Sequence, residues 1–503
     1  MKKIITFVAN MRSKITIMLL LVAAFVMAQN PKREFRGAWI QSVNGQFQGM
    51  SRDVMQKTLS EQLDVLQRDG INAIFFQVRC EGDALYDSRY EPWSRFLTGQ
   101  QGQAPNPYWD PLAWMVEQCH LRNMECHAWI NPFRAKTKAT TTLANTHAYF
   151  SHRDHFFDYD GLLLFDPGIP ENWDFICEVI KDIVKRYDVD GIHMDDYFYP
   201  YPVAGVAIPD DATYQKYSKG GDRGDWRREN VNKFMKQAFK TVRSTKPWVK
   251  FGVSPFGIYR NQRTDPEGSA TTGLQNYDDL YADVLKWVEE GWVDYNIPQL
   301  YWEIGNKAAD YETLIRWWSQ HAGQRPLYVG QDVMRTIKHT DPSNPNAHQM
   351  GAKYALQRSL PGIYGSCQWY AKAVVDDEGN YGSFLRQYYH NTIALQPLCP
   401  WIDSKAPKKI RKCKIVWTND GPVLFWSAPR GRKEMDKARQ YAVYRFTEDQ
   451  PVDFKDSRNI FCITQNTYLN LEYKGGETNY VYYVTALDRL QNESKPVKQK
   501  VSL

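Results

Sequence analysis

Two adjacent aspartates, Asp195 and Asp196, directly follow a short apolar run that is typical of a buried β-strand. Side chains alternate along a strand, so His193, Asp195 and Tyr197 share one face of it. A carboxylate at a strand end can act as nucleophile or general base toward the anomeric carbon of a sugar. We therefore predict that Asp195 and Asp196 are catalytic. The alternative is that the two aspartates only cap the helix that follows.

Glycoside hydrolysis requires a second carboxyl group that can donate a proton. Glu303 follows two aromatic residues, and apolar surroundings raise the pKa of a carboxyl. We predict that Glu303 is this acid. Asp196, Glu81 and Asp83 are alternatives for the same role.

Polar and aromatic side chains also alternate at the ends of three other predicted strands. Polar side chains that point into a protein interior are costly unless they bond to each other or to a ligand. Each one alone could be a satisfied core residue, but together they predict one pocket. The predicted substrate-binding residues are Gln77, Arg79, Glu81, Asp83, His127, Trp129, Asn131, His193, Tyr197, Gln299, Tyr301 and Trp302.

The elements that carry these residues form a regular series. Strand-like apolar runs alternate with amphipathic helical segments, and no glycine-rich dinucleotide fingerprint follows the first run. This series predicts an α/β fold, a (β/α)₈ TIM barrel over residues 29–400 with its site at the C-terminal ends of the strands. The eight predicted strands are 35–43, 71–80, 125–133, 189–197, 250–258, 293–302, 326–333 and 362–370. The long connections 135–171 and 198–225 are expected on the rim that builds the site.

Beyond Pro397 and Pro400 the hydrophobic period changes to two. Short strand-like runs and turns such as Asn419-Asp420-Gly421 predict an all-β, immunoglobulin-like sandwich over residues 404–503. The segment 480–494 resembles the last core strand and turn of a fibronectin type III domain. We expect this domain to fold separately, and its role is docking, targeting or spacing.

The first 28 residues carry four basic residues and no acid, and they contain a short apolar run before Ala28. These features predict a signal peptide and export to the periplasm or the extracellular space, with no membrane span after cleavage. Removing the four positive charges lowers the net charge from +6 to 6 − 4 = +2. Such a small net charge argues against nucleic acid as a partner.

The eight cysteines form no CxxC pair, and buried thiols are the default interpretation. His and carboxylate residues do not cluster at ligand spacing, so we predict no metal and no cofactor.

The motifs as a set resemble the glycosyl-hydrolase-like 10 family. The matching segments include Glu34-Phe-Arg-Gly-Ala-Trp-Ile, Asn72-Ala-Ile-Phe-Phe-Gln-Val-Arg, Gly82-Asp-Ala-Leu-Tyr, His127-Ala-Trp-Ile-Asn-Pro-Phe-Arg, Asp190-Gly-Ile-His-Met-Asp-Asp-Tyr-Phe-Tyr-Pro, Gly252-Val-Ser-Pro-Phe-Gly and Gln299-Leu-Tyr-Trp. The resemblance implies sugar chemistry, and it implies that Asp83, His127, Asp195 and Asp196 are important. An enterobacterial relative acts on peptidoglycan glycan strands stripped of stem peptides.

The segment from Asp190 also resembles the D-G-x-D-x-D-x-E pattern of chitinase-type barrels. Here His193 and Tyr197 replace its middle aspartate and its final glutamate. That departure removes the acid that substrate-assisted hydrolysis requires.

These observations predict an exported glycoside hydrolase whose partner is a glycan polymer. The expected polymer is the glycan strands of the bacterial cell wall. Aromatic residues make up 14% of the chain, which suits a cleft that stacks sugar rings. A glycosidase for dietary or host polysaccharide is one alternative. A catalytically inactive glycan-binding protein is another, although the rim carboxylates argue against it.

Overall fold

The computed structural model describes residues 30–503, so the predicted signal peptide lies outside the described residues. Eight parallel strands close into a barrel in the order β1-β13-β10-β9-β8-β7-β3-β2, and this confirms the predicted TIM barrel. Each predicted strand segment contains one of them. The strands are β1 (Phe35–Ile40), β2 (Ala73–Arg79), β3 (Glu125–Ile130), β7 (Gly191–Met194), β8 (Lys250–Val253), β9 (Tyr295–Asn296), β10 (Leu327–Asp332) and β13 (Ile363–Trp369).

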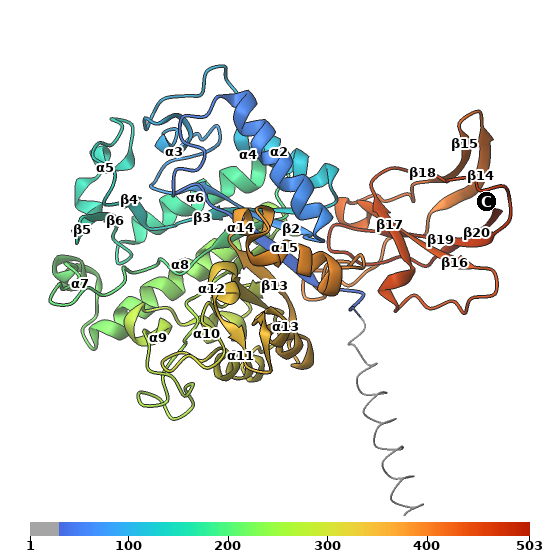
Figure 1. Cartoon of the computed structure of the whole chain (residues 1–503). Coiled ribbons are helices and arrows are strands. Elements are labelled where there is room, and N and C mark those ends of the chain that lie inside the picture. Colours follow the sequence, from blue (N-terminus) through green and yellow to red (C-terminus); the bar gives the residue numbers. More distant parts are fainter. Residues whose placement is uncertain (1–29) are drawn as a thin grey trace, which may run out of the picture.

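Helices surround the barrel, and their ends follow local sequence signals (Figure 1). Ser51 caps the first by accepting from the Val54 amide, and Asp110 caps the next one, which has Pro111 in its first turn. The surrounding helices are α2 (Arg52–Arg68), α4 (Pro111–Leu121), α6 (Pro170–Arg186), α8 (Arg223–Thr245), α10 (Val284–Glu289), α11 (Tyr311–Gln320), α13 (Met350–Ser359), α14 (Ala371–Val375) and α15 (Tyr381–Phe384).

The amphipathic segment 277–290, whose pattern suits one helix, does not form a continuous helix. The chain forms the short helix α9 (Asn276–Asp279), breaks, and then forms α10. Tyr281 lies in the break with a φ of 55°, a left-handed conformation that a continuous right-handed helix cannot contain.

Two hydrophobic clusters separate the inside of the barrel from its shell. Ile192 and Met194 of β7 belong to the large cluster between strands and helices. Phe75 and Tyr295 belong to a smaller cluster on the barrel axis. The alternation predicted for the fourth strand therefore holds, because His193 contacts the axial rings of Phe75 and Tyr295.

The connections after β3 and β7 build much of one rim, as expected. The first contains a three-stranded sheet of β4 (Arg134–Lys136), β5 (Phe156–Tyr159) and β6 (Leu162–Phe165), with the short helix α5 (Ala148–Ser151). The second contains α7 (Asp211–Tyr217). Smaller elements complete the loops: α3 (Arg95–Thr98), α12 (Val333–Lys338), β11 (Thr340–Asp341) and β12 (Asn344–His348).

The C-terminal segment forms two antiparallel sheets that enclose a separate core containing Leu424, Trp426 and Val484. This confirms the predicted β domain, and its assignment to the fibronectin type III class stays a prediction. One sheet contains β14 (Arg411–Thr418), β15 (Gly421–Ser427) and β18 (Tyr468–Asn470), and the other contains β17 (Ile460–Thr464), β16 (Gln440–Thr447), β19 (Asn479–Leu487) and β20 (Val497–Ser502).

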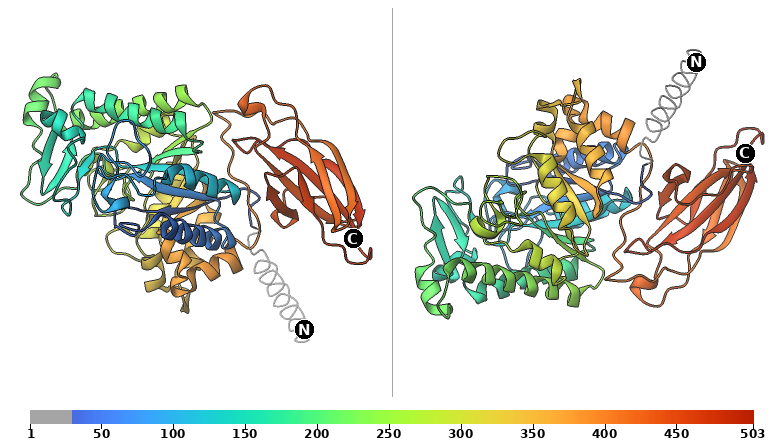
Figure 2. Two further views of the ribbon diagram at one scale, coloured as in Figure 1. Left: turned by 90° about the horizontal axis from the view of Figure 1, so that it is seen from above. Right: turned by 90° about the horizontal axis from the view of Figure 1, so that it is seen from below.

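The β domain lies at the N-terminal ends of the barrel strands, opposite the rim that carries β4–β6 (Figures 1 and 2). Arg439 and Arg489 of this domain pair with Asp188, just before β7, at 3.0 and 2.8 Å. Leu395, which follows the barrel, belongs to a hydrophobic cluster of the β domain. The domain is therefore attached to the end of the barrel that is remote from the predicted site.

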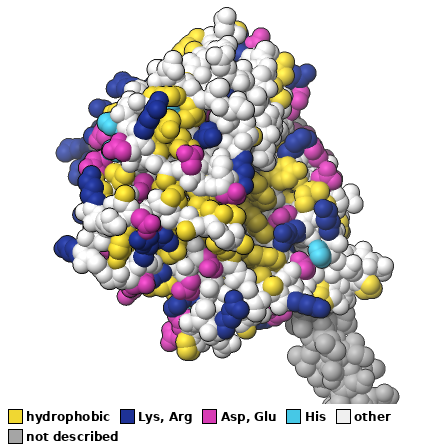
Figure 3. Space-filling model, turned by 90° about the vertical axis from the view of Figure 1, so that its left-hand side faces the viewer, with side chains coloured by type: hydrophobic (Ala, Val, Ile, Leu, Met, Phe, Trp, Pro, Cys, Tyr) yellow, Lys and Arg dark blue, Asp and Glu magenta, His cyan; other side chains and the backbone are white. Residues whose placement is uncertain are grey.

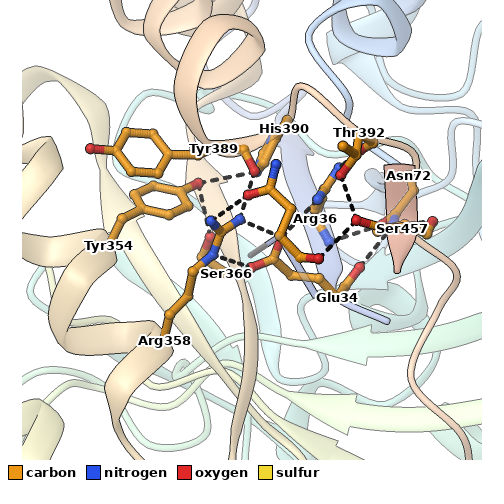
Figure 4. Close-up of polar contacts among 12 residues, drawn as sticks. Glu34, Arg36, Asn72, Tyr354, Arg358, Ser366, Tyr389, His390, Thr392 and Ser457 are labelled. Atoms are coloured by element: carbon orange, nitrogen blue, oxygen red, sulfur yellow. Dashed lines mark hydrogen bonds and ion pairs between the residues drawn. The ribbon is translucent and has the colours of Figure 1, made fainter. Parts of the chain in front are cut away.

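A buried polar network strengthens this attachment (Figure 4). Glu34 bonds to Arg36 at 2.8 Å and to Arg358 at 2.9 Å. Next to them, Thr392 and Ser457 share a hydrogen bond of 3.0 Å that joins the barrel to the β domain. The network fixes the beginning of β1 and the chain that leaves the barrel.

All eight cysteine thiols are free. Within residues 30–503, no helix is long and apolar enough to cross a membrane.

Candidate active site

A cavity of about 270 Å³ opens at the C-terminal ends of the barrel strands, and we call it the aspartate cleft. Hydrophobic side chains gather around the centre of the left-hand face of the molecule (Figure 3). The aromatic residues of the cleft are Trp39, Trp129, Tyr197, Tyr301 and Trp369. Its polar residues are Asn44, Gln77, Arg134, Asp195, Asp196, Ser254 and Gln299.

Asp195 lies at the base of the cleft, and only 5% of its surface is exposed. The Asn131 side-chain amide donates to its two carboxylate oxygens, at 2.8 and 2.7 Å. Gln77 Nε2 and Arg134 Nη2 both donate to Asn131 Oδ1, at 2.7 and 2.8 Å. These two donors fix the orientation of the amide, so that its NH₂ group must face Asp195.

Asp196 is equally buried, and it accepts a hydrogen bond from the Tyr201 hydroxyl, whereas Gln299 Nε2 donates to the Ser254 carbonyl at 2.8 Å. Burial raises the pKa of Asp196 to about 6, although the Tyr201 and Gln299 side chains oppose the shift. Burial and the neighbouring Asp196 charge raise the pKa of Asp195 to about 7. Because two like charges this close are costly, the pair retains a proton near neutral pH.

Glu303 does not have the predicted properties. Its carboxylate accepts from Asn306 Nδ2 at 2.7 Å and lies 3.8 Å from His339 Nε2. Burial alone would raise its pKa, but these contacts outweigh burial and the pKa is lowered. Glu303 is also absent from the lining of the aspartate cleft, and Trp302 packs against Phe256 instead of lining the cleft. The pKa of Glu303 is thus lowered where the sequence led us to expect it raised, and its role as the acid stays a prediction.

Three predicted residues of the second strand support the loops around the cleft. Arg79 is fully buried, pairs with Glu91 at 2.6 Å and donates to the Asn131 and Pro132 carbonyls. Glu81 bonds to Arg95, Thr137 and Thr140. Burial and the Glu81 charge raise the pKa of Asp83 to about 6, and its carboxylate accepts from Gln101 Nε2 at 3.1 Å. None of the three lines the cleft.

Both predicted histidines lie inside the barrel, below the cleft. His127 bonds to the Tyr295 hydroxyl and to Glu125, each at 3.0 Å. His193 Nε2 lies 3.2 Å from Trp39 Nε1 and 3.1 Å from Ser254 Oγ. Burial lowers the pKa of His193 well below its ordinary value, so the ring is neutral and can accept from Trp39. The histidines thus support the cleft floor and do not line the cavity.

Several cleft residues were not predicted, namely Trp39, Asn44, Arg134, Ser254 and Trp369. Arg134 and Ser254 lie in the motifs that begin at His127 and Gly252, so the motifs could have identified both as cleft residues. Arg134 also lies 5.3 Å from the Tyr197 ring centre. Trp369 ends the eighth strand, where the alternation rule could have been applied.

A buried pair of carboxyl groups at the C-terminal end of a (β/α)₈ barrel, inside an aromatic cleft, is typical of barrel glycoside hydrolases. Comparison with known proteins agrees. Residues 34–346 match the family model described as glycosyl hydrolase-like 10, and the chain belongs to this family.

Two curated relatives are named glycosyl hydrolases. YngK of Bacillus subtilis (strain 168) is 38% identical over 490 residues, covering 94% of each chain. DigH of Escherichia coli (strain K12) is 40% identical over 326 residues, covering 60% of this chain and 74% of DigH. Among solved structures, the PgaB glycoside hydrolase domain of Bordetella bronchiseptica is 12% identical with a TM-score of 0.46, and the match covers 73% of this chain and 100% of that one. The protein is a glycoside hydrolase.

Proposed function

We propose that the aspartate cleft hydrolyses a glycan polymer through Asp195 and Asp196. The observation that carries this proposal is the pair of buried carboxyl groups with raised pKa values at the base of an aromatic cleft. One carboxyl holds a proton and donates it to the glycosidic oxygen. The other is ionised. It stabilises the positive charge that develops at the anomeric carbon, or it provides the nucleophile that attacks this carbon.

Asn131 sets the electrostatics of this pair. Its NH₂ group donates to Asp195 in the ionised form, and the nearby Arg134 cation favours that form too. The two groups moderate the effect of burial, so that the proton can leave the pair when the leaving group accepts it. The aromatic rings of the cleft offer flat apolar faces on which sugar rings stack.

The proposed substrate is the glycan strand of the bacterial cell wall, and the proposed location is the periplasm or the cell exterior. The features of residues 1–28 support export, and the resemblance to a family with a peptidoglycan-acting member supports this substrate. Dietary or host polysaccharide is the competing substrate class.

The test is to incubate the mature protein with denuded peptidoglycan strands, chitin oligosaccharides and a polysaccharide panel, and to identify products by mass spectrometry. Shortened saccharides from the denuded strands alone support the proposal. Products from a plant or host polysaccharide alone would support the alternative, a glycosidase for dietary or host polysaccharide. Binding without any product would identify an inactive glycan-binding protein.

A further inference from the structure

A second groove lies on the same rim as the aspartate cleft, between segments 99–103 and 139–146. Its volume is about 660 Å³, compared with about 270 Å³ for the cleft. The loop after β1 connects the two, because it supplies Asn44 to the cleft while its Gly49 amide donates to the Leu97 carbonyl at 3.0 Å. The two sites are therefore formed by loops that pack against each other on this rim.

The groove has the chemistry of a neutral, hydroxyl-rich ligand. Amide and hydroxyl side chains dominate its lining, and Arg95 is its only charged lining residue. Among the described residues, no hydrogen bond involves the side chains of Gln103, Thr142 or Asn145, which are exposed. Uncharged donors and acceptors of this kind match the hydroxyl and amide groups of sugars, whereas an ionic ligand would require opposite charges.

Segments 99–103 and 139–146 form the two walls of the groove, and a buried carboxylate bonds to each wall. Glu81 accepts from Arg95 Nε at 3.0 Å and from Thr140 Oγ1 at 2.7 Å. Asp83 accepts from Gln101 Nε2, and Gln101 Oε1 in turn accepts from the Ala144 amide at 2.9 Å. Each wall is therefore tied to the end of β2. A site held in this way loses little conformational entropy when a ligand binds.

An exposed aromatic residue lies beside the same wall. Tyr108 is 59% exposed and packs edge-on against Trp93, with ring centres 6.0 Å apart. The Trp93 carbonyl accepts from the amide of Gly102, which lines the groove, at 2.8 Å. An exposed ring in a fixed orientation is a surface on which a sugar can stack.

We propose that this groove is a second saccharide-binding site, which holds a part of the glycan chain distant from the bond that is cleaved. The inference rests on the proposed function and adds to it a preference for long chains. It also gives Glu81 and Asp83 a role, since they position the groove and do not take part in the reaction.

The test removes the unbonded polar groups from the groove. The triple variant Gln103→Ala/Thr142→Ala/Asn145→Ala is made in the Asp195→Asn background, where we expect turnover to be strongly reduced. A matched control, Gln324→Ala/Asn419→Ala in the same background, removes exposed amides at the N-terminal end of β10 and in the β domain. Thermal melting confirms that each protein is folded. Calorimetric titration then compares a denuded-glycan tetrasaccharide with long denuded strands.

We expect the triple variant to bind long strands about tenfold more weakly, because each lost hydrogen bond weakens binding modestly. Its affinity for the tetrasaccharide and the affinities of the control are expected to stay unchanged. Unchanged affinity for long strands, or an equal loss for both ligands, would overturn the second site while wild-type turnover leaves the proposed function intact. If the wild-type protein neither binds nor cleaves these glycans, the proposed function fails, and the groove proposal fails with it.

Discussion

At the residue scale, a small number of firmly held side chains surrounds Asp195 and Asp196. Asn131 contacts Asp195 directly, and Gln77 and Arg134 fix the Asn131 amide. Such support holds a reacting group in place without reorganisation during the reaction. The chemistry therefore belongs to the pair, and the neighbouring side chains set its geometry and its pKa values.

Replacing either aspartate removes one of the two carboxyl groups that hydrolysis requires. We expect Asp195→Asn and Asp196→Asn each to lower kcat by at least ~100-fold, because general acid–base and nucleophilic groups contribute on that scale. Steady-state turnover of a confirmed substrate measures this effect, and circular dichroism shows whether the fold is kept. A folded variant with near-normal turnover would remove that aspartate from the mechanism.

The raised pKa of Asp195 also predicts how its replacement changes stability with pH. The folded-state pKa lies above the unfolded value of about 3.9, so the folded protein binds more protons than the unfolded chain between about pH 4 and pH 7. The free energy of unfolding therefore falls as the pH rises through that window. Asp195→Asn removes the ionisation that causes this fall in the free energy of unfolding. The Tm of the variant should therefore exceed that of the wild-type protein at about pH 8. The difference should disappear toward pH 4, and a lower Tm for the variant at pH 8 contradicts the assignment.

Replacing Glu303 distinguishes the two possible catalytic pairs, which are Asp195 with Asp196 and Asp195 with Glu303. Its carboxylate bonds to Asn306, has a lowered pKa and does not line the cleft. We expect Glu303→Gln to keep kcat within about threefold of the wild-type value, because the group is not a proton donor near neutral pH. A pH–rate profile that loses its alkaline limb in Glu303→Gln would restore Glu303 as the acid.

At the element scale, β7 carries the aspartates, and its sequence explains why it lies so close to its neighbour. A Cβ atom added at Gly191 would lie 2.2 Å from Nδ1 of His127 on β3. That ring is fixed by Tyr295 and Glu125 and cannot withdraw without breaking those bonds. The glycine thus allows the two strands to pair with the histidine buried between them.

Gly191→Ala should therefore destabilise the protein by about 1–3 kcal/mol, which is typical of overpacking in a close-packed interior. It should also lower kcat, because any shift of β7 moves Asp195 relative to Asn131. Chemical denaturation measures the first effect, and turnover measures the second. Equal stability of the two proteins would show that the barrel interior has more room at this position than its packing indicates.

The elements were more predictable from the sequence than the site was. Hydrophobic period and alternation placed all eight barrel strands and oriented His193 correctly, since both signals are local. Alternation failed for Glu303, because β9 ends at Asn296 and the chain beyond it is a loop with no fixed period. Local patterns also could not show that Arg79 and Glu81 bond to Glu91 and Thr140, because these contacts depend on how separate loops fold together.

At the scale of the whole molecule, the β domain contacts the N-terminal ends of the barrel strands, whereas residues at the C-terminal ends line the aspartate cleft. Contacts such as Asp188 with Arg489, and Lys32 with Glu493 at 2.6 Å, tie the domain to the beginnings of the barrel strands. Trp401 lies between the barrel and the β domain, and its indole N–H donates to the Asp294 carboxylate at 2.8 Å. The domain therefore stabilises the barrel base and contributes no lining residue to the cleft.

A chain that ends at Asp403 retains the Trp401 contact and loses the β domain. We expect it to cleave soluble oligosaccharides with unchanged kcat, because the cleft is intact. Its Tm should be lower, because Leu395 becomes exposed and the ion pairs of Asp188 with Arg439 and Arg489 are lost. Lost turnover in a truncated protein shown to be folded would mean that the β domain affects the site. A loss confined to insoluble substrate would assign a targeting role to the domain.

Hydrolysis through Asp195 and Asp196 is tested by incubating the protein with denuded glycan strands in water labelled with the heavy oxygen isotope and analysing the products by mass spectrometry. Hydrolysis through Asp195 and Asp196 adds one water molecule per cleaved bond. We expect labelled oxygen at each new reducing end with the wild-type protein, and at least ~100-fold slower appearance of new ends with either aspartate variant. Unlabelled or anhydro ends from the wild-type protein, or labelled ends formed at a near-wild-type rate by a folded Asp195→Asn variant, would contradict hydrolysis through this pair.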